Sequence, residues 1–292
     1  MKNFNKYFLA AVIVVSIFTG CKKESFQNDS IIEVPSVTGT WSYTLPADMT
    51  EADSTFLITL TLDKAQVVDI HVPISAGDGT AAEDADFALS DHAIVIPAGS
   101  TSGKVKLNIY TDAEIEEDET VVVNLGDESV ANAAIPIQSV NLILHNYVAP
   151  YLDLSFDWSG TATVDTVNVV DLCDVDLDVL VFDVDGNDLG IYGAATGNCP
   201  EQLSTDGWDD GDYYLKANLW DNSVVHPTNG EIIGFPIRIG IVQAGAFDEV
   251  LPQNPNNIIN SSEPDAANDG GDTTKGLIRI TKTGNSYTYE LL

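Results

Sequence analysis

The sequence has 292 residues, enough for two domains of ordinary size, and 44% of them are hydrophobic. Asp and Glu number 45 against 12 Lys and Arg, so the net charge is −33. Nucleic acids and anionic membrane surfaces are bound through basic residues, and this charge argues against both as partners. The balance is typical of a soluble extracytoplasmic protein that meets divalent cations.

Residues 1–20 are predicted to be a signal peptide. Lys2 and Lys6 precede an apolar run over residues 8–18, in which Ser16 is the only polar member. A helix that spans a bilayer needs about 20 residues, so this run has instead the length of the apolar core of a signal peptide.

The residues that follow, Thr19-Gly20-Cys21, resemble a bacterial lipobox, with Phe18 where that motif usually has Leu. The resemblance implies lipidation of Cys21 and a lipid anchor at the bacterial outer membrane, facing the periplasm or the cell surface. The alternative is an ordinary cleaved signal with a chance cysteine. Beyond the cysteine, residues 21–36 are polar and aperiodic, and we expect them to form a flexible tether.

Residues 37–147 form the first predicted domain, and period-two alternation marks its strands. Apolar and polar side chains alternate over residues 56–62, 69–74, 104–110 and 121–125. Seven or so short strands separated by turns predict a β-sandwich. The loop before the last of these segments contains six acids: Asp112, Glu114, Glu116, Glu117, Asp118 and Glu119. Carboxylates packed this closely repel one another, so the loop either splays into water or holds a cation.

Several short motifs in this domain resemble those of the Calx-beta domain family. In chain order they are Gly79-Thr80-Ala81, Asp86-Phe87, Ile96-Pro97-Ala98-Gly99, Asp112 and Glu116-Glu117-Asp118-Glu119-Thr120. The resemblance covers about residues 37–146 and implies a Greek-key, immunoglobulin-like β-sandwich that often binds calcium at one tip. It names neither a substrate nor a partner.

The resemblance also implies a set of calcium ligands, which are Glu51, Asp86, Asp112, Glu116 and Glu119. Thr111 replaces one acid of the family pattern, and His145-Asn146 replaces its final aspartate cluster. Calcium takes six to eight oxygens, so five carboxylates with water and backbone carbonyls can hold one ion. The alternative is a solvated acidic loop on a very acidic protein. His71 is expected to face solvent rather than bind a metal.

Residues 148–292 are predicted to form a second all-β domain, a β-sandwich or jelly roll, after a boundary at Ala149-Pro150. Its alternating segments are residues 152–158, 173–181, 213–220, 235–241, 277–281 and 286–291. With Cys21 lipidated, Cys173 and Cys199 remain, and in an oxidising compartment we expect them to form a disulfide. Closing this loop stabilises the fold by about 3 kcal/mol on the chain-entropy model.

Three further features of this half have two readings each. The run Asp183–Asp188 reads as an Asp-Gly turn, or as a calcium loop without its closing glutamate. Trp208, Tyr213 and Tyr214 either pack in the core or stack on a sugar ring. Residues 252–274 form a long loop, and loops of that length are functional or disordered.

The sequence contains no recognised catalytic motif: no Gly-x-Ser-x-Gly, no His-Glu-x-x-His and no phosphate-binding glycine loop. The first hypothesis is a non-enzymatic, lipid-anchored surface protein whose calcium-binding module serves adhesion or protein contact. The second is a glycan-binding accessory lipoprotein that acts through its C-terminal domain. A glycoside hydrolase is the third, because 45 acids guarantee chance carboxylate pairs.

Overall fold

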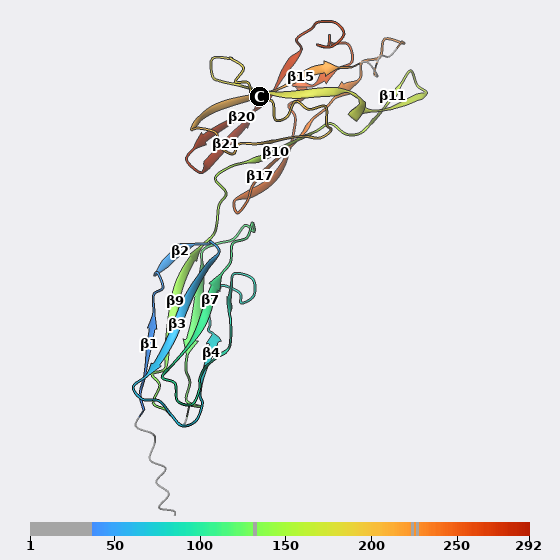
Figure 1. Ribbon diagram of the computed structural model, residues 1–292. Coiled ribbons are helices and arrows are strands. Elements are labelled where there is room, and N and C mark those ends of the chain that lie inside the picture. Colours follow the sequence, from blue (N-terminus) through green and yellow to red (C-terminus); the bar gives the residue numbers. More distant parts are fainter. Residues whose placement is uncertain (1–36, 131–132, 223–224, 226–227) are drawn as a thin grey trace, which may run out of the picture.

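A computed structural model describes residues 37–130, 133–222, 225 and 228–292, and these residues form two β-structured modules that follow one another along the chain (Figure 1). The predicted all-β fold class is confirmed. The helical residues described are two short 3-10 turns, η1 (Leu172–Asp174) and η2 (Pro255–Asn257). Within the described ranges, no helix is long and apolar enough to cross a membrane. The predicted signal peptide, Cys21 and the tether lie outside these ranges.

Two sheets form a sandwich in the first module. The four-stranded sheet has the order β1-β3-β7-β5, with β1 (Gly39–Tyr43), β3 (Ser54–Leu62), β7 (Ser102–Ile109) and β5 (Phe87–Leu89). The five-stranded sheet has the order β2-β9-β8-β4-β6, with β2 (Asp48–Thr50), β9 (Gln138–His145), β8 (Glu119–Leu125), β4 (Ile70–Ala76) and β6 (Ala93–Ile96). Neighbouring strands are antiparallel except β2 and β9, which run parallel.

The core of this sandwich follows from the alternation in the sequence. In β7, Val105, Leu107 and Ile109 are each 1% exposed, while Lys104 and Lys106, which alternate with them, face solvent. Burying an aliphatic side chain of this size stabilises the fold by about 1.5–3 kcal/mol, so one face of each strand is fixed to the interior. The strands therefore carry the loops at their ends to defined places at the two tips.

The second module contains two four-stranded sheets and two short ladders. One sheet has the order β14-β10-β17-β18, with β14 (Glu201–Ser204), β10 (Asp153–Asp157), β17 (Arg238–Gln243) and β18 (Phe247–Pro252). The other has the order β13-β15-β20-β21, with β13 (Asp176–Phe182), β15 (Gly211–Asp221), β20 (Thr274–Thr283) and β21 (Ser286–Leu291). The short ladders pair β11 (Thr161–Val164) with β12 (Asn168–Asp171), and β16 (Gly234–Phe235) with β19 (Ile259–Asn260).

Two strands of this module differ from the prediction: one begins three residues later, and the other is divided in two. The strand expected from Cys173 begins at Asp176, because Cys173 lies in η1, where the Asp171 carboxylate accepts a hydrogen bond from its backbone N–H at 3.0 Å. The strand expected over residues 235–241 is divided into β16 and β17. Pro236 lies at the division, where proline has no N–H for a ladder.

The long loop predicted over residues 252–274 is ordered by its own hydrogen bonds. Asp265 is 2% exposed, and its carboxylate accepts bonds from the backbone N–H groups of Asn222 and Asn268. Burial alone raises the pKa of Asp265, but the bonds from Asn268 and Asn222 outweigh it and hold the pKa below its usual value. The segment is therefore ordered, and backbone hydrogen bonds from Ala266 and Ala267 join it to β15.

Each module has its own hydrophobic core. The core of the first module ends at Leu144 in the sequence, and the core of the second begins at Leu152. The turn between β17 and β18 meets the acidic tip of the first module across this division. Gly245 donates its N–H to the carbonyl oxygen of Ala113 at 3.2 Å. Asn146 donates its amide to the carbonyl oxygen of Gly245 at 2.8 Å.

Candidate functional site

The five acids proposed as calcium ligands come from separate parts of the first module and meet at the tip near the second. Strand ends place them there. Glu51 follows β2, Asp86 precedes β5, Asp112 and Glu116 lie between β7 and β8, and Glu119 opens β8. Carboxylate oxygens of Asp86, Glu116 and Glu119 lie within 4.8 Å of one another.

Two of these carboxylates are buried, which is unusual for acids without a basic partner. Glu51 is 4% and Asp86 5% exposed. The backbone orients both: Glu51 Oε2 accepts from the N–H of Tyr147 at 3.2 Å, and Asp86 Oδ2 accepts from the N–H of Ala82 at 2.5 Å. The Oε2 atom of Glu119 is also buried, and it has no hydrogen-bond partner in the described part of the chain.

The electrostatics show that the five groups act on one another. Burial, a hydrogen bond with Asp86 and repulsion by neighbouring acids raise the pKa of Glu119 to about 7. Burial and repulsion from Asp86, Asp112 and Glu51 raise the pKa of Glu116. Burial also raises the pKa of Glu51 despite the bond from Tyr147, with Asp112 and Asp86 adding to the rise. The protein itself thus does little to neutralise the negative charge of this cluster.

The donor set fits a hard divalent cation. All five side chains offer carboxylate oxygens, the ligands that calcium prefers, and together they can supply most of its six to eight contacts. The buried, unpartnered oxygen of Glu119 supports this fit, because a cation would satisfy it. The structure therefore clusters three predicted ligands, Asp86, Glu116 and Glu119, and repulsion from Glu51 and Asp112 adds to the raised pKa of Glu116.

The positions that depart from the family pattern have other contacts here. His145 Nδ1 lies 2.9 Å from Asp118 Oδ2, so the imidazole contacts an acid of the loop. Asn146 donates to the carbonyl oxygen of Glu116 at 3.3 Å, while its own Oδ1 is buried without a partner in the described residues. This amide oxygen is an additional acceptor beside the cluster. The sequence indicated this acceptor only through the position of Asn146, which stands where the family pattern has aspartate.

The remaining predicted features lie away from this tip. His71 is exposed on β4, as expected. Asp183 closes its own turn by accepting bonds from the N–H groups of Asp185 and Asn187 and from the Asn187 amide, which favours the turn reading.

The three aromatic residues considered for glycan contact are partly buried. The rings of Trp208 and Tyr213 lie 4.4 Å apart and pack against the core of the second module. Tyr214, the next residue of β15, is also partly buried. In this arrangement the rings of Trp208 and Tyr213 contribute to packing.

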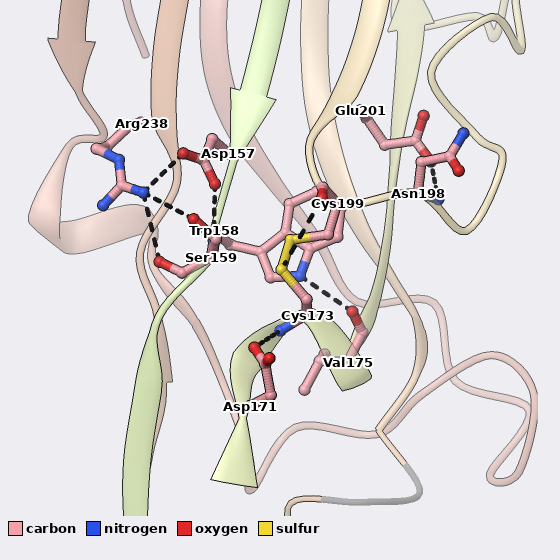
Figure 2. The surroundings of a disulfide bond; sticks show 10 residues. All are labelled: Asp157, Trp158, Ser159, Asp171, Cys173, Val175, Asn198, Cys199, Glu201 and Arg238. Atoms are coloured by element: carbon pink, nitrogen blue, oxygen red, sulfur yellow. Dashed lines mark hydrogen bonds and ion pairs between the residues drawn. A yellow bond between two sulfur atoms is a disulfide. The ribbon is translucent and has the colours of Figure 1, made fainter.

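The predicted disulfide between Cys173 and Cys199 is present, and it joins η1 to the segment before β14 (Figure 2). The indole of Trp158 lies behind it and donates Nε1–H to the carbonyl oxygen of Val175 at 3.0 Å. Two residues beyond the bridge, Glu201 Oε1 accepts from the N–H groups of Thr196 and Asn198. The bridge and Glu201 together fix the loop of residues 192–200.

The fold and tip define an all-β protein of sandwich modules with an oxygen-rich, acidic cluster at one end of the first. Residues 44–147 match the model of the Calx-beta domain family, which confirms the resemblance over this segment. The match indicates a binding module over this segment. No curated protein matches the chain.

Several solved structures resemble the chain at low similarity. The apo form of the Calx CBD1 domain is 17% identical, with a TM-score of 0.30, over 38% of this chain and 98% of that one. A structural-genomics protein of unknown function from Bacteroides ovatus is 11% identical, with a TM-score of 0.28, over 88% and 98%. A putative carbohydrate binding protein from Bacteroides ovatus ATCC 8483 is 11% identical, with a TM-score of 0.26, over 86% and 83%. Similarity at this level carries no functional argument.

Proposed function

We propose that this chain is a lipid-anchored, extracytoplasmic binding protein whose Calx-beta-like tip binds calcium and serves adhesion or protein interaction at the cell surface. The observation that supports the calcium claim is the cluster of Asp86, Glu116 and Glu119, in which Glu119 Oε2 is buried and unpartnered among the described residues. Burial raises the pKa values of Glu51, Glu116 and Glu119, and mutual repulsion adds to the rise; a divalent cation removes that repulsion.

Calorimetry of the purified protein tests the calcium claim. We expect the melting temperature to rise on addition of CaCl₂ and to return to its starting value with a chelator, because an ion that binds only the folded state stabilises it. Extracellular calcium modules bind at about 10⁻⁴ to 10⁻³ M, so the titration should cover that range. Melting curves that coincide with and without calcium would remove the claim.

The anchor is tested separately, at Cys21. Cells are grown with a labelled fatty acid, and the wild-type protein is compared with Cys21→Ser. The lipobox resemblance predicts label and membrane association for the wild type, and loss of both for the variant. Equal labelling of the two proteins contradicts the anchor and leaves the calcium result unaffected.

The adhesion role depends on the calcium site and is tested last. Cells displaying the wild type or Glu119→Gln are compared for attachment to a surface in calcium and in chelator. Attachment that needs both calcium and Glu119 supports the role, and attachment that ignores both contradicts it.

A further inference from the structure

A second concave site lies on the second module, on the outer face of the sheet formed by β13 and β15. It is a cavity of about 700 Å³. The strands contribute Asp176 and Asp178 from β13 and Asn218 and Trp220 from β15, and register pairs Asp178 with Asn218. This volume lies within the range of sites for small molecules, about 300–1,000 Å³.

Bonds within the protein fix the two side walls of the cavity in the absence of a ligand. One wall, which includes Tyr192 and Thr196, is fixed by the disulfide and by the bonds of Glu201. The other includes Asp272 and belongs to the segment that Asp265 orders, whose Ala266 and Ala267 donate backbone N–H groups to β15. A preformed site loses little entropy on binding.

Two aromatic rings in the lining are open to solvent. Trp220 is 48% and Tyr192 57% exposed, in contrast to the packed pair Trp208 and Tyr213. Large aromatic side chains usually bury most of their surface, and an exposed ring beside a cavity offers a flat face for a sugar ring or a cation.

The hydrogen-bonding groups of the lining are mostly acceptors. Asp176, Asp178 and Asp272 provide carboxylates. Most side-chain donors are already used within the protein: Tyr192 donates to Asp188 at 3.1 Å, Thr196 to Glu201, and the Asn218 amide to Asp272 at 3.3 Å. The indole N–H of Trp220 adds one further donor group. A ligand that satisfies this lining must therefore be rich in donors.

The charge of the site points the same way. Asp176 Oδ1 is buried and has no partner in the described residues. Burial and repulsion from Glu201 and Asp221 raise the pKa of Asp176, and burial with repulsion from Asp176 and Glu201 raises the pKa of Asp178 to about 6. Lys216 is not among the lining residues, and its ammonium lies over the Phe182 ring, 4.2 Å from the centroid.

We propose that this cavity binds an amino sugar, with the protonated amine and the hydroxyls donating to Asp176, Asp178 and Asp272 and the ring face lying on Trp220 or Tyr192. An amino sugar supplies the cation and the donors that the carboxylates need, and its apolar ring face matches the exposed aromatic rings. A uronic acid carries a carboxylate into an acidic cavity and is rejected. The site is independent of calcium at the first module, so binding is expected to be equal in calcium and in chelator.

Calorimetric titration of the full chain at slightly acid pH, with three hexasaccharides, tests this proposal. The probes are the hexamers of glucosamine, N-acetylglucosamine and galacturonate. We expect the glucosamine hexamer to bind most tightly and the galacturonate hexamer not to bind. Trp220→Ala should weaken binding about fivefold or more, the loss of one ring contact, while Tyr43→Ala, an exposed ring in the first module, should leave it unchanged.

A second pair of variants separates binding from folding. Asp178→Asn removes a cavity carboxylate, and Asp174→Asn removes an exposed one outside the cavity. Only the first should weaken glucosamine binding, with both proteins melting as cooperatively as the wild type. The proposal is overturned if the glucosamine hexamer does not bind, if Trp220→Ala and Asp178→Asn bind it like the wild type, or if galacturonate binds as well. Shortening of the hexamer during the titration would make the cavity hydrolytic and also overturn it.

Discussion

The side-chain amide of Asn146 lies 2.8 Å from the carbonyl oxygen of Gly245, and this bond joins the tip that carries the acidic cluster to the β17–β18 turn of the second module. The same amide donates to the carbonyl oxygen of Glu116 at 3.3 Å. One side chain thus contacts both the loop of the candidate ligands and the neighbouring module.

Asn146→Ala is expected to loosen this junction. Each hydrogen bond lost contributes about 0.5–1.5 kcal/mol, and two carbonyl groups lose a donor. Calorimetry should show the two modules melting further apart in temperature than in the wild type. Asn141→Ala, at an exposed position on β9, is the control and should change nothing.

Gly245→Ala should have a larger effect at the same junction. Gly245 has φ +75°, and an added Cβ would lie 1.7 Å from the carbonyl oxygen of Tyr147. A non-glycine residue in this region costs about 1–3 kcal/mol before any clash. Limited proteolysis should cut the Gly245→Ala protein between the modules faster than the wild type. Equal rates would show that the contact contributes little to holding the modules together.

Glu119→Gln is predicted to have opposite effects with and without calcium. In the metal-free protein above about pH 7, where Glu119 is ionised, the substitution removes a charge that Asp86, Glu116 and Glu51 repel, so the melting temperature should rise. With calcium it removes a ligand, so the stabilisation by CaCl₂ should shrink or vanish. Glu117→Gln, an exposed neighbour, is the matched control and should behave like the wild type. A Glu119→Gln protein that keeps the full calcium response would exclude Glu119 as a ligand.

The candidate ligands follow from the resemblance to the Calx-beta family, whereas alternation in the sequence predicted the strands and the faces that they bury. Val105, Leu107 and Ile109 alternate cleanly, and they are buried as predicted. The cavity of the second module could not be predicted in this way. It brings Asp176 together with Asp272, nearly a hundred positions later, through a segment whose order depends on the buried Asp265. The alternating segments do not include the strands β11, β12, β14, β18 and β19, which depend on their partner strands rather than on a pattern of their own.

The disulfide gives a prediction confined to the second module. Cys173→Ser with Cys199→Ser opens a loop between residues 26 apart, and the chain-entropy model predicts a loss of about 3 kcal/mol. The calorimetric transition of the second module should fall in temperature while that of the first stays in place. Trp158 lies behind the bridge and reports the change by its fluorescence. A fall of both transitions would contradict this prediction, because it would show that the two modules unfold as one unit.

The pH dependence of stability follows from the raised pKa of Glu119. Its folded-state pKa of about 7 lies above the value of 4.5 for a free glutamate. Between these values the folded chain keeps a proton that the unfolded chain has lost, so folding stability decreases as pH rises. Burial raises the pKa values of Glu51 and Glu116 as well, and both contribute in the same direction.

We therefore expect the melting temperature of the metal-free protein to fall between about pH 4.5 and pH 7, measured in chelator at constant ionic strength. Asp178, with a pKa of about 6, adds a fall of the same sign from the second module, and Asp178→Asn separates the two contributions. Calcium should reverse the trend, because the ion binds the deprotonated carboxylates and its affinity rises as they lose their protons. A metal-free protein that gains stability over this range would show that the carboxylates of the tip are not in mutual conflict, and the case for a cation between them would fail.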